Sequence, residues 1–215
     1  GDVLWTSPNS FVASANCALY CGAAVDFVDI EPDTANMCPE LLEHKLLAAA
    51  KENKLPKVLV VVHFAGCSAN MQAISKLARK FGVKIIEDAS HAVGGSYLGS
   101  PVGNCKLSDI AVFSFHPVKM ITTGEGGALV TNDDCWADEA RKLRTHGITR
   151  SKDQFVFPQD QGDWYYEQHD LGLNYRMTDF QAALGVSQLK RLPQFVDRRN
   201  EIAKKYDRAF ADTPI

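Results

Sequence analysis

The chain has 215 residues, of which 46% are hydrophobic and 23% charged, and its formal net charge is −3. This composition is that of a globular protein with a substantial core, and it argues against a disordered chain. The weakly acidic balance gives no sign of a nucleic-acid or membrane partner, and no apolar run approaches the ~18 residues of a membrane span.

The six cysteines are scattered along the chain, at Cys17, Cys21, Cys38, Cys67, Cys105 and Cys135. A secreted disulfide framework is denser in a shorter chain, so the pattern predicts reduced, mostly buried thiols and a cytoplasmic protein. Cys17 and Cys21 are one helical turn apart, but no further Cys or His pair completes a zinc set, so we expect no metal site.

Short apolar runs typical of strands alternate with amphipathic segments typical of helices. Strands are expected at 25–30, 57–64, 83–88, 109–115 and 127–133. Helices are expected at 39–53, 71–82, 134–147, 178–192 and 191–210. Pro39 suits a helix start, and Gly82 and Gly147 suit helix ends. The alternation predicts an α/β fold: a mostly parallel sheet with helices on both faces.

The character of the chain changes over residues 152–170. This segment has Pro158, Gly162, several acids and clustered aromatics, so it is predicted to be a long ordered loop. Thr178 and Gln181 then have the spacing of a reciprocal capping box at the start of a helix. The basic amphipathic segment 191–210 is expected to open a second structural unit.

Polar side chains stand where two predicted strands end. Asp88 closes the strand at 83–88, Ser114 lies at the end of the strand at 109–115, and Lys119 follows in a glycine-rich loop. In open α/β sheets ligands bind beyond the carboxyl ends of strands. An amine, a carboxylate and a hydroxyl suit pyridoxal phosphate, which needs a Schiff-base lysine, a partner for its ring nitrogen and donors for its phosphate.

Each of these residues also has an ordinary structural interpretation. Lys119 could be a surface lysine in a turn, Asp88 a turn acid, and Ser114 a strand-end hydroxyl bonded to the backbone. A nucleophilic lysine at neutral pH needs its pKa lowered by roughly three units, which burial and a nearby positive charge can supply. Spacing alone therefore leaves both interpretations open.

Longer motifs carry a family resemblance along nearly the whole chain. They are SPNSFVASANCALYCGAAVDFVDIEPDT, VVVHFAGCSANMQAISKLARKFGVKIIEDASHAVGGSYLGSPVG, SDIAVFSFHPVKMITTGEGGALVTND, LRTHGI and LGLNYRMTDFQAALGVSQL. On these motifs the chain resembles the DegT–StrS-type sugar-nucleotide aminotransferases, which are pyridoxal-phosphate enzymes of the aspartate-aminotransferase fold. The resemblance implies a cofactor-binding large domain over residues 1–190, lacking its N-terminal part, and the start of a C-terminal small domain over 191–215. We thus expect a chain truncated at both ends.

The resemblance also implies site residues. Lys119 matches the Schiff-base lysine and proton shuttle, and Asp88 matches the partner of the pyridinium nitrogen. The other matched positions are His91 beside the ring, Ser114 at the phosphate or the bound intermediate, Phe11 stacked on the ring, and Asn174 at the cofactor phosphate of a neighbouring subunit. The match at Asn174 therefore implies a homodimer with shared active sites. The ordinary alternatives are a satisfied loop histidine for His91, core packing for Phe11 and a left-handed turn for Asn174.

Finer motifs, FHPVKMITTGEGG, HGITR and WYYEQHDLGLNYRMTD, resemble one branch of the family. That branch transfers an amino group from glutamate to C4 of a UDP-linked 4-keto-6-deoxy-N-acetylhexosamine, in nonulosonic (pseudaminic) acid biosynthesis. Two alternatives remain. Related sugar dehydratases carry histidine in place of the Schiff-base lysine, and Lys119 argues against that. A non-catalytic regulatory or nucleotide-binding module could use residues 91–103 as a glycine loop, but these lack G-x-G-x-x-G spacing.

Overall fold

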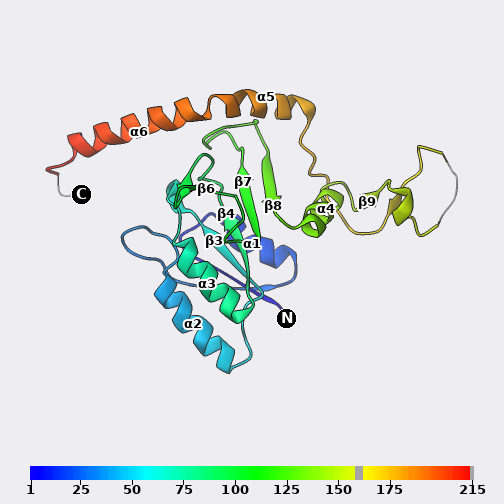
Figure 1. Ribbon diagram of the computed structural model, residues 1–215, viewed down its shortest axis with the longest axis horizontal. Coiled ribbons are helices and arrows are strands. Elements are labelled where there is room, and N and C mark those ends of the chain that lie inside the picture. Colours follow the sequence, from blue (N-terminus) through cyan, green and yellow to red (C-terminus); the bar gives the residue numbers. More distant parts are fainter. Residues whose placement is uncertain (158–161, 214–215) are drawn as a thin grey trace.

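The computed structural model describes residues 1–157 and 162–213 of the chain (Figure 1). Within them a six-stranded sheet has the order β2-β1-β3-β4-β7-β8. Its strands are β1 (Val3–Thr6), β2 (Ala24–Phe27), β3 (Val58–Val62), β4 (Lys84–Asp88), β7 (Ile110–Ser114) and β8 (Gly127–Thr131). Neighbouring strands run parallel except for β7 and β8, which are antiparallel. The predicted α/β sheet is confirmed.

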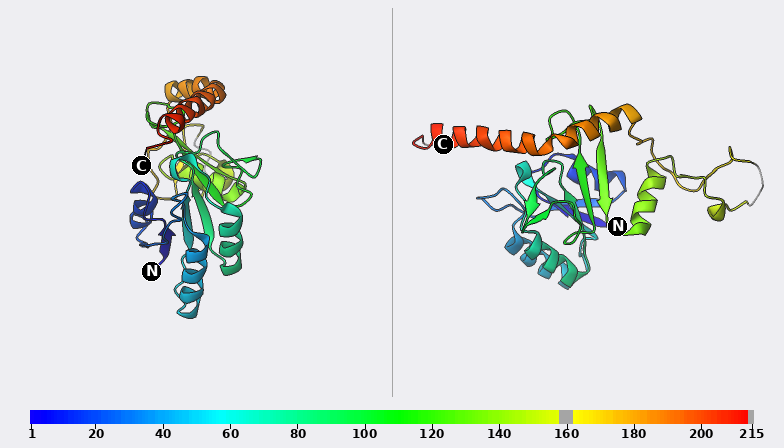
Figure 2. Two further views of the ribbon diagram at one scale, coloured as in Figure 1. Left: turned by 90° about the vertical axis from the view of Figure 1, so that its left-hand side faces the viewer. Right: turned by 45° about the horizontal axis from the view of Figure 1, so that its top comes forward.

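The helices flank this sheet. They are α1 (Ala13–Tyr20), α2 (Pro39–Lys51), α3 (Met71–Phe81), α4 (Asp134–Leu143), α5 (Asp179–Lys190) and α6 (Leu192–Ala209). Helix α1 covers one face, and α2 and α3 cover the other, as the left view of Figure 2 shows. Short elements complete the fold: η1 (Phe64–Gly66), the β5–β6 hairpin (Ser96–Tyr97 and Ser100–Pro101), β9 (Ile148–Thr149), η2 (Lys152–Gln154) and β10 (Glu167–Gln168).

The central strand β3 divides the core between the two faces. Leu59 and Val61 are fully buried in the larger cluster, beneath α2 and α3, with Leu42 and Ile74. Val60, between them in sequence, belongs to a smaller cluster with Ala18 of α1. A strand covered on both faces reads as a continuous apolar run because each of its two side-chain rows is buried.

Two predicted helix boundaries are confirmed by their capping geometry. Helix α3 ends at Gly82, which has a left-handed φ of 71°, a conformation that costs glycine little. Helix α5 begins after Thr178, and Thr178 and Gln181 form the full reciprocal capping box. The backbone therefore follows the local sequence signals at both positions.

The prediction that Gly147 ends α4 is wrong. The helix stops at Leu143, and both His146 and Gly147 have positive φ. The backbone N–H of His146 donates to the carbonyl of Leu173 at 2.8 Å. The returning segment thus takes over the backbone pairing that a longer helix would have used, and Gly147 serves that later turn.

The expectation of mostly buried thiols is also wrong. All six cysteines are free, as expected, but only Cys105 is buried. Cys17, Cys21, Cys67 and Cys135 are exposed, and Cys38 is half-buried. Cys17 fails as a core residue because α1 turns only Ser14 and Ala18 into the protein.

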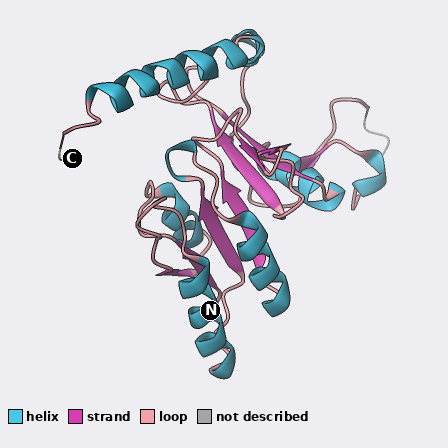
Figure 3. Cartoon of the chain, turned by 60° about the vertical axis from the view of Figure 1, so that its left-hand side comes forward, coloured by secondary structure: helices cyan, strands magenta, loops and turns pink. Residues whose placement is uncertain are grey.

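Helices α5 and α6 form a nearly continuous rod that crosses the end of the sheet beside β7 and β8 and then projects beyond it (Figures 1 and 3). Neither helix has a buried residue. The predicted loop over 152–170 contains η2 and β10, which pairs with β9 just before the loop; Pro158 and its neighbours up to residue 161 lie outside the described residues. Nowhere in the described ranges is a helix apolar and long enough to span a bilayer.

Candidate active site

The candidate site lies at the carboxyl ends of the parallel strands, beside a topological switch point. From β1 the chain passes through α1 to β2 on one side, whereas from β3 it passes through α3 to β4 on the other. The two crossover helices lie on opposite faces of the sheet. Open α/β sheets bind ligands in the crevice that such a reversal leaves.

Asp88 and Ser114 meet at this edge. Asp88 is the last residue of β4 and pairs with Val112 of β7, and Ser114 is the last residue of β7. Paired residues of parallel strands point to the same face, and side chains alternate along each strand. Asp88 and Ser114 are therefore on one face, which is the face covered by α1.

Hydrogen bonds hold both oxygens of the Asp88 carboxylate. The buried hydroxyl of Ser14 donates to Oδ2 at 2.7 Å, and the backbone N–H of Ser90 donates to Oδ1 at 3.2 Å. The hydrogen bond from Ser90 is the local turn that we expect if Asp88 is only a turn acid. The hydrogen bond from Ser14 is not local, because it joins the end of β4 to α1.

Lys119 lies in a loop that is closed at its base. The N–H of Phe115 donates to the carbonyl of Gly126 at 2.8 Å, and the N–H of Thr123 donates to the carbonyl of Phe115 at 2.9 Å. Lys119 itself closes a turn onto the carbonyl of His116 at 2.9 Å. These bonds keep the half-buried Lys119 close to the end of β7.

His91 lies near enough to both Lys119 and Asp88 for each charge to affect its pKa. Burial lowers the pKa of His91, and the charge of Lys119 lowers it further, whereas the charge of Asp88 raises it. The imidazole thus feels both the amine and the carboxylate. Within the described residues its ring makes no side-chain hydrogen bond, so the satisfied-histidine interpretation has no support.

The backbone around His91 is fixed by a close contact with a neighbouring loop. Gly66 has a φ of 86°, and a Cβ at this position would lie 2.8 Å from the carbonyl oxygen of His91. Only glycine permits this approach of two backbones without strain. The loops after β3 and β4 are therefore packed together at the backbone of His91.

Phe11 is not a core residue. Its side chain is 74% exposed, and it lies between β1 and α1. Its carbonyl accepts a hydrogen bond from the N–H of Ser14 at 3.1 Å, so it is next to the residue that contacts Asp88. An exposed ring at this edge is free to contact a ligand.

The hydroxyl of Ser114 retains its donor capacity. Its Oγ accepts a long contact of 3.4 Å from the N–H of His116, and this contact uses a lone pair and not the hydroxyl hydrogen. The backbone-bonded interpretation of Ser114 is therefore correct only in part.

Asn174 lies apart from the other five predicted site residues. It forms an isolated backbone bridge with Thr145, beside the end of α4, and its side chain is exposed. Its φ is not among the positive values found in the described chain, so the left-handed-turn interpretation is wrong. The structure thus places Phe11, Asp88, His91, Ser114 and Lys119 in the segments that follow β1, β4 and β7 or at the ends of these strands, and leaves Asn174 facing solvent.

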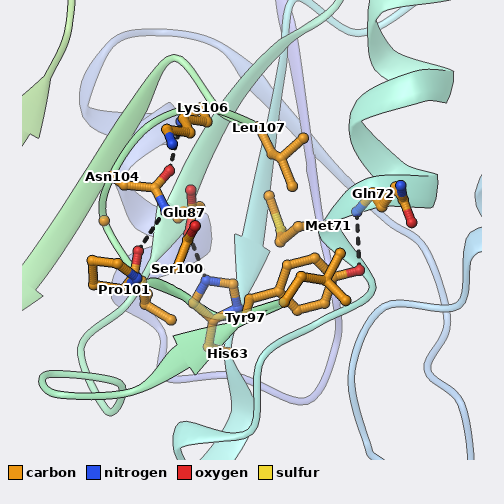
Figure 4. Close-up of a pocket in the computed structure, with 13 residues that line it drawn as sticks. His63, Met71, Gln72, Glu87, Tyr97, Ser100, Pro101, Asn104, Lys106 and Leu107 are labelled. Carbon is orange, nitrogen blue, oxygen red and sulfur yellow. Dashed lines mark hydrogen bonds and ion pairs between the residues drawn. The ribbon is translucent and has the colours of Figure 1, made fainter.

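A second polar cluster lies on the opposite face of the sheet, in the cavity of about 220 Å³ shown in Figure 4. His63 Nδ1 accepts from the N–H of Ala69 at 3.2 Å, so its other ring nitrogen donates to Glu87 at 2.8 Å. The hydroxyl of Ser108 donates to the second carboxylate oxygen of Glu87. The sequence did not predict this cluster, whose buried groups satisfy one another.

The glycine-rich segment 91–103 does not form a nucleotide-binding loop. It folds back as the β5–β6 hairpin, with Ser96 paired to Pro101 and Tyr97 to Ser100. A dinucleotide loop connects a strand to a helix and presents backbone N–H groups at the helix start. The binding-module alternative therefore lacks the structure that it requires.

Known proteins resemble this chain along its whole length. The model of the DegT/DnrJ/EryC1/StrS aminotransferase family matches residues 1–215. A Campylobacter jejuni UDP-4-amino-4,6-dideoxy-N-acetyl-beta-L-altrosamine transaminase is 42% identical over 212 residues, which are 99% of this chain and 52% of that protein. The Bacillus subtilis spore coat polysaccharide biosynthesis protein SpsC is 41% identical over 214 residues, covering 100% and 52% of the two chains.

Solved structures give the same result. Helicobacter pylori PseC, an aminotransferase of pseudaminic acid biosynthesis, superposes with a TM-score of 0.86 at 36% identity, over 99% of this chain and 52% of that one. A proposed sugar aminotransferase of Streptococcus pneumoniae, in a PLP form, gives 0.80 at 29% identity, over 99% and 54%. The chain thus spans about half the length of the relatives that it matches. With this match over its full length, the chain belongs to the DegT/DnrJ/EryC1/StrS aminotransferase family.

Proposed function

We propose that the protein is a pyridoxal-phosphate-dependent aminotransferase of nonulosonic (pseudaminic) acid biosynthesis. It moves an amino group from glutamate to the C4 keto group of a UDP-linked 4-keto-6-deoxy-N-acetylhexosamine. The observation that carries the proposal is that Asp88 and Ser114 end the neighbouring strands β4 and β7 on one face of the sheet, and that the loop holding Lys119 is tied to the end of β7. An amine and a carboxylate at one edge of a sheet can together bind a small aromatic aldehyde.

The chemistry of the donor set fits pyridoxal phosphate. Asp88 offers carboxylate oxygens to a protonated ring nitrogen, Lys119 offers a primary amine to the aldehyde, and Ser114 offers a hydroxyl hydrogen to the phosphate. Phe11 offers an exposed ring for stacking. When bound, the cofactor supplies the electron sink for cleavage of bonds at the amino-bearing carbon.

The chain's own residues then have distinct roles. Lys119 Nζ would hold the cofactor covalently and, once released, move a proton at the amino-bearing carbon of donor and product. Positioned proton transfer of this kind contributes roughly 10²–10⁴-fold to rate. Asp88 would hold a proton at the ring nitrogen. His91, whose pKa is lowered, would be neutral near pH 7 and able to hydrogen-bond the ring substituents.

The substrate rests on similarity and not on the described side chains. The Campylobacter jejuni transaminase and Helicobacter pylori PseC both support a sugar-nucleotide acceptor of the pseudaminic acid type. Glutamate as donor follows from the family resemblance. The six free cysteines support a reducing, cytoplasmic location.

A homodimer with shared active sites is part of the proposal. Asn174 faces solvent within a stretch of strongly exposed apolar side chains: Leu171 (92%), Tyr175 (73%) and Phe180 (91%). Exposed apolar patches of this kind mark interaction surfaces. A second subunit seated there would bury these side chains and bring its own cofactor phosphate within reach of Asn174. The division into a large domain (1–190) and the start of a small domain (191–215) belongs to the same proposal.

The test combines cofactor attachment with turnover. Reduction of the pyridoxal-phosphate-loaded protein with borohydride should leave the cofactor on the peptide that contains Lys119, as mass spectrometry would show. Lys119→Arg keeps the charge but should abolish formation of 2-oxoglutarate from glutamate and the keto sugar. Lys106→Arg, an exposed lysine on the opposite face, is the matched control and should retain activity. Near wild-type turnover by Lys119→Arg would refute the proposal.

A further inference from the structure

Helix α1 places a hydroxyl group in a position where an apolar side chain is expected. Its inward stripe consists of Ser14 and Ala18, which are both only 4% exposed. Ala18 packs in the apolar cluster beneath the helix. A hydroxyl buried beside it costs free energy unless it is hydrogen-bonded. The partner of Ser14 is Oδ2 of Asp88, at 2.7 Å.

A second serine extends this contact. Ser10 Oγ lies 2.6 Å from Ser14 Oγ. Since the hydrogen of Ser14 is committed to Asp88, the hydrogen of Ser10 must be the one shared between the two hydroxyls. The order of donation is therefore fixed, from Ser10 to Ser14 to the carboxylate. Chains of hydrogen bonds that end on a charge strengthen one another.

The carboxylate is held from two sides. Ser14 fixes Oδ2 from α1, and the N–H of Ser90 fixes Oδ1 from the loop after β4. Each oxygen keeps a free lone pair, because a carboxylate has about four acceptor sites. A cationic N–H can approach the exposed edge of the group without displacing either donor. Donors to a carboxylate also favour its charged form.

We infer that Ser14, supported by Ser10, is a positioning residue that aims the Asp88 carboxylate at the ring nitrogen of the cofactor. The inference rests on the proposed function. Neither serine needs to touch the cofactor. Their role is to keep Asp88 charged and fixed in orientation, so that the ring nitrogen stays protonated and the bound cofactor remains a strong electron sink.

The test measures the cofactor's spectrum and affinity. In Ser14→Ala, the pH midpoint at which the pyridoxal-phosphate-loaded protein loses its yellow absorption band should rise by about one pH unit. The band belongs to the protonated imine on Lys119, which holds its proton to higher pH when the ring nitrogen carries less positive charge. A hydrogen bond to a charged group is worth about as much as such a shift. The dissociation constant for pyridoxal phosphate should rise about tenfold for the same reason. Ser10→Ala should shift both values in the same direction by less, and Ser14→Thr, which keeps the hydroxyl, should restore most of each.

Ser75→Ala is the matched control. Ser75 is a buried serine on α3, on the opposite face of the sheet, and its hydroxyl has no hydrogen-bond partner among the described residues. Its removal should change neither the midpoint nor the affinity. A purely structural role for Ser14 would lower the free energy of unfolding and leave the pH midpoint in place.

The outcomes separate this inference from the proposed function. If the wild-type protein binds pyridoxal phosphate but Ser14→Ala has the same midpoint and affinity as Ser75→Ala, the inference fails and the proposed function stands. A shift in Ser14→Ala that Ser14→Thr reverses supports the inference. If the wild-type protein takes up no pyridoxal phosphate, the proposed function fails, and the inference fails with it.

Discussion

At the scale of single residues, His91 provides a measurable test of the site without any cofactor. Its pKa is lowered by partial burial and by the charge of Lys119, and raised by Asp88. NMR titration should give a midpoint below the ordinary 6.5. Lys119→Met removes a positive charge and should raise the midpoint, whereas Asp88→Asn removes a negative charge and should lower it.

Lys106→Met is the control for this titration, because it removes a charge from the opposite face and should leave His91 unchanged. An unchanged midpoint in both the Lys119 and Asp88 variants would show that the three groups are not neighbours. The lowered pKa of His91 also determines how its contribution to the stability of the fold depends on pH. The contribution of His91 to stability is present above pH 6.5 and is lost as the pH falls through the lower folded-state value.

The sequence predicts Asp88, Ser114 and Lys119 as site residues because each lies at or just beyond the end of an apolar strand, and the structure confirms the ends of those strands. It could not locate Ser14, because α1 is short and consists largely of small residues, and its buried stripe has only two members. Such a helix has little periodicity to read. The contact with Asp88 also spans 74 positions, and no local pattern encodes a pairing at that distance.

At the scale of elements, Glu167 organises the segment that carries β9 and β10. Its carboxylate accepts from the backbone N–H groups of Val156 and Phe157 at 2.7 and 3.0 Å, from Tyr165 at 3.1 Å and from His169 at 2.8 Å. Burial raises the pKa of Glu167, but these hydrogen bonds outweigh it and lower the pKa to about 2. One side chain therefore holds together a segment that has almost no regular secondary structure.

We expect the order of this segment to depend on that charge. Because the folded-state pKa is depressed from 4.5 to about 2, the stabilisation is present above pH 4.5 and is lost as the pH falls toward 2. Glu167→Gln should speed amide exchange at Val156 and Phe157 at neutral pH. Glu201→Gln, an exposed acid on α6, is the control and should not affect these amides. Equal protection in the Glu167 variant and wild type would contradict this role.

Helix boundaries could be predicted from the sequence where a residue caps the helix through nearby backbone groups. Gly82 and the Thr178 capping box are of this kind, since their signals act within one helical turn. Gly147 misled the prediction because its positive φ serves a turn that pairs with Leu173, far along the chain. Tertiary pairing decides such a boundary, and the local sequence shows only that a turn is present.

At the scale of the whole molecule, the exposed position of Asn174 predicts that each active site draws on two chains. Lys119→Ala and Asn174→Ala should each be inactive as homodimers. Mixing them should give heterodimers in which one site has both wild-type residues. With random exchange, about a quarter of wild-type activity should return, because half the dimers then hold one of two intact sites.

A chain that carries both substitutions, mixed with wild type, is the control, since its heterodimers contain no intact site. Absence of recovery in the first mixture would mean that Asn174 serves its own chain, or none. Sedimentation or light scattering should show a dimer whose association buries Leu171 and Phe180, both more than 90% exposed here. Replacing Phe180 with a charged residue should therefore weaken association.

The arrangement of side chains at the end of β4 determines whether the protein can tolerate a deletion in this strand. Its adjacent acids serve different faces: Glu87 joins the His63 cluster in the interior, and Asp88 meets Ser14 at the opposite surface. Deleting one residue from this strand would exchange the two acids, because side chains alternate. His63 would then lose the carboxylate of Glu87 at the same moment as the candidate site lost Asp88. We therefore expect related proteins to differ in length outside β4 and not within it.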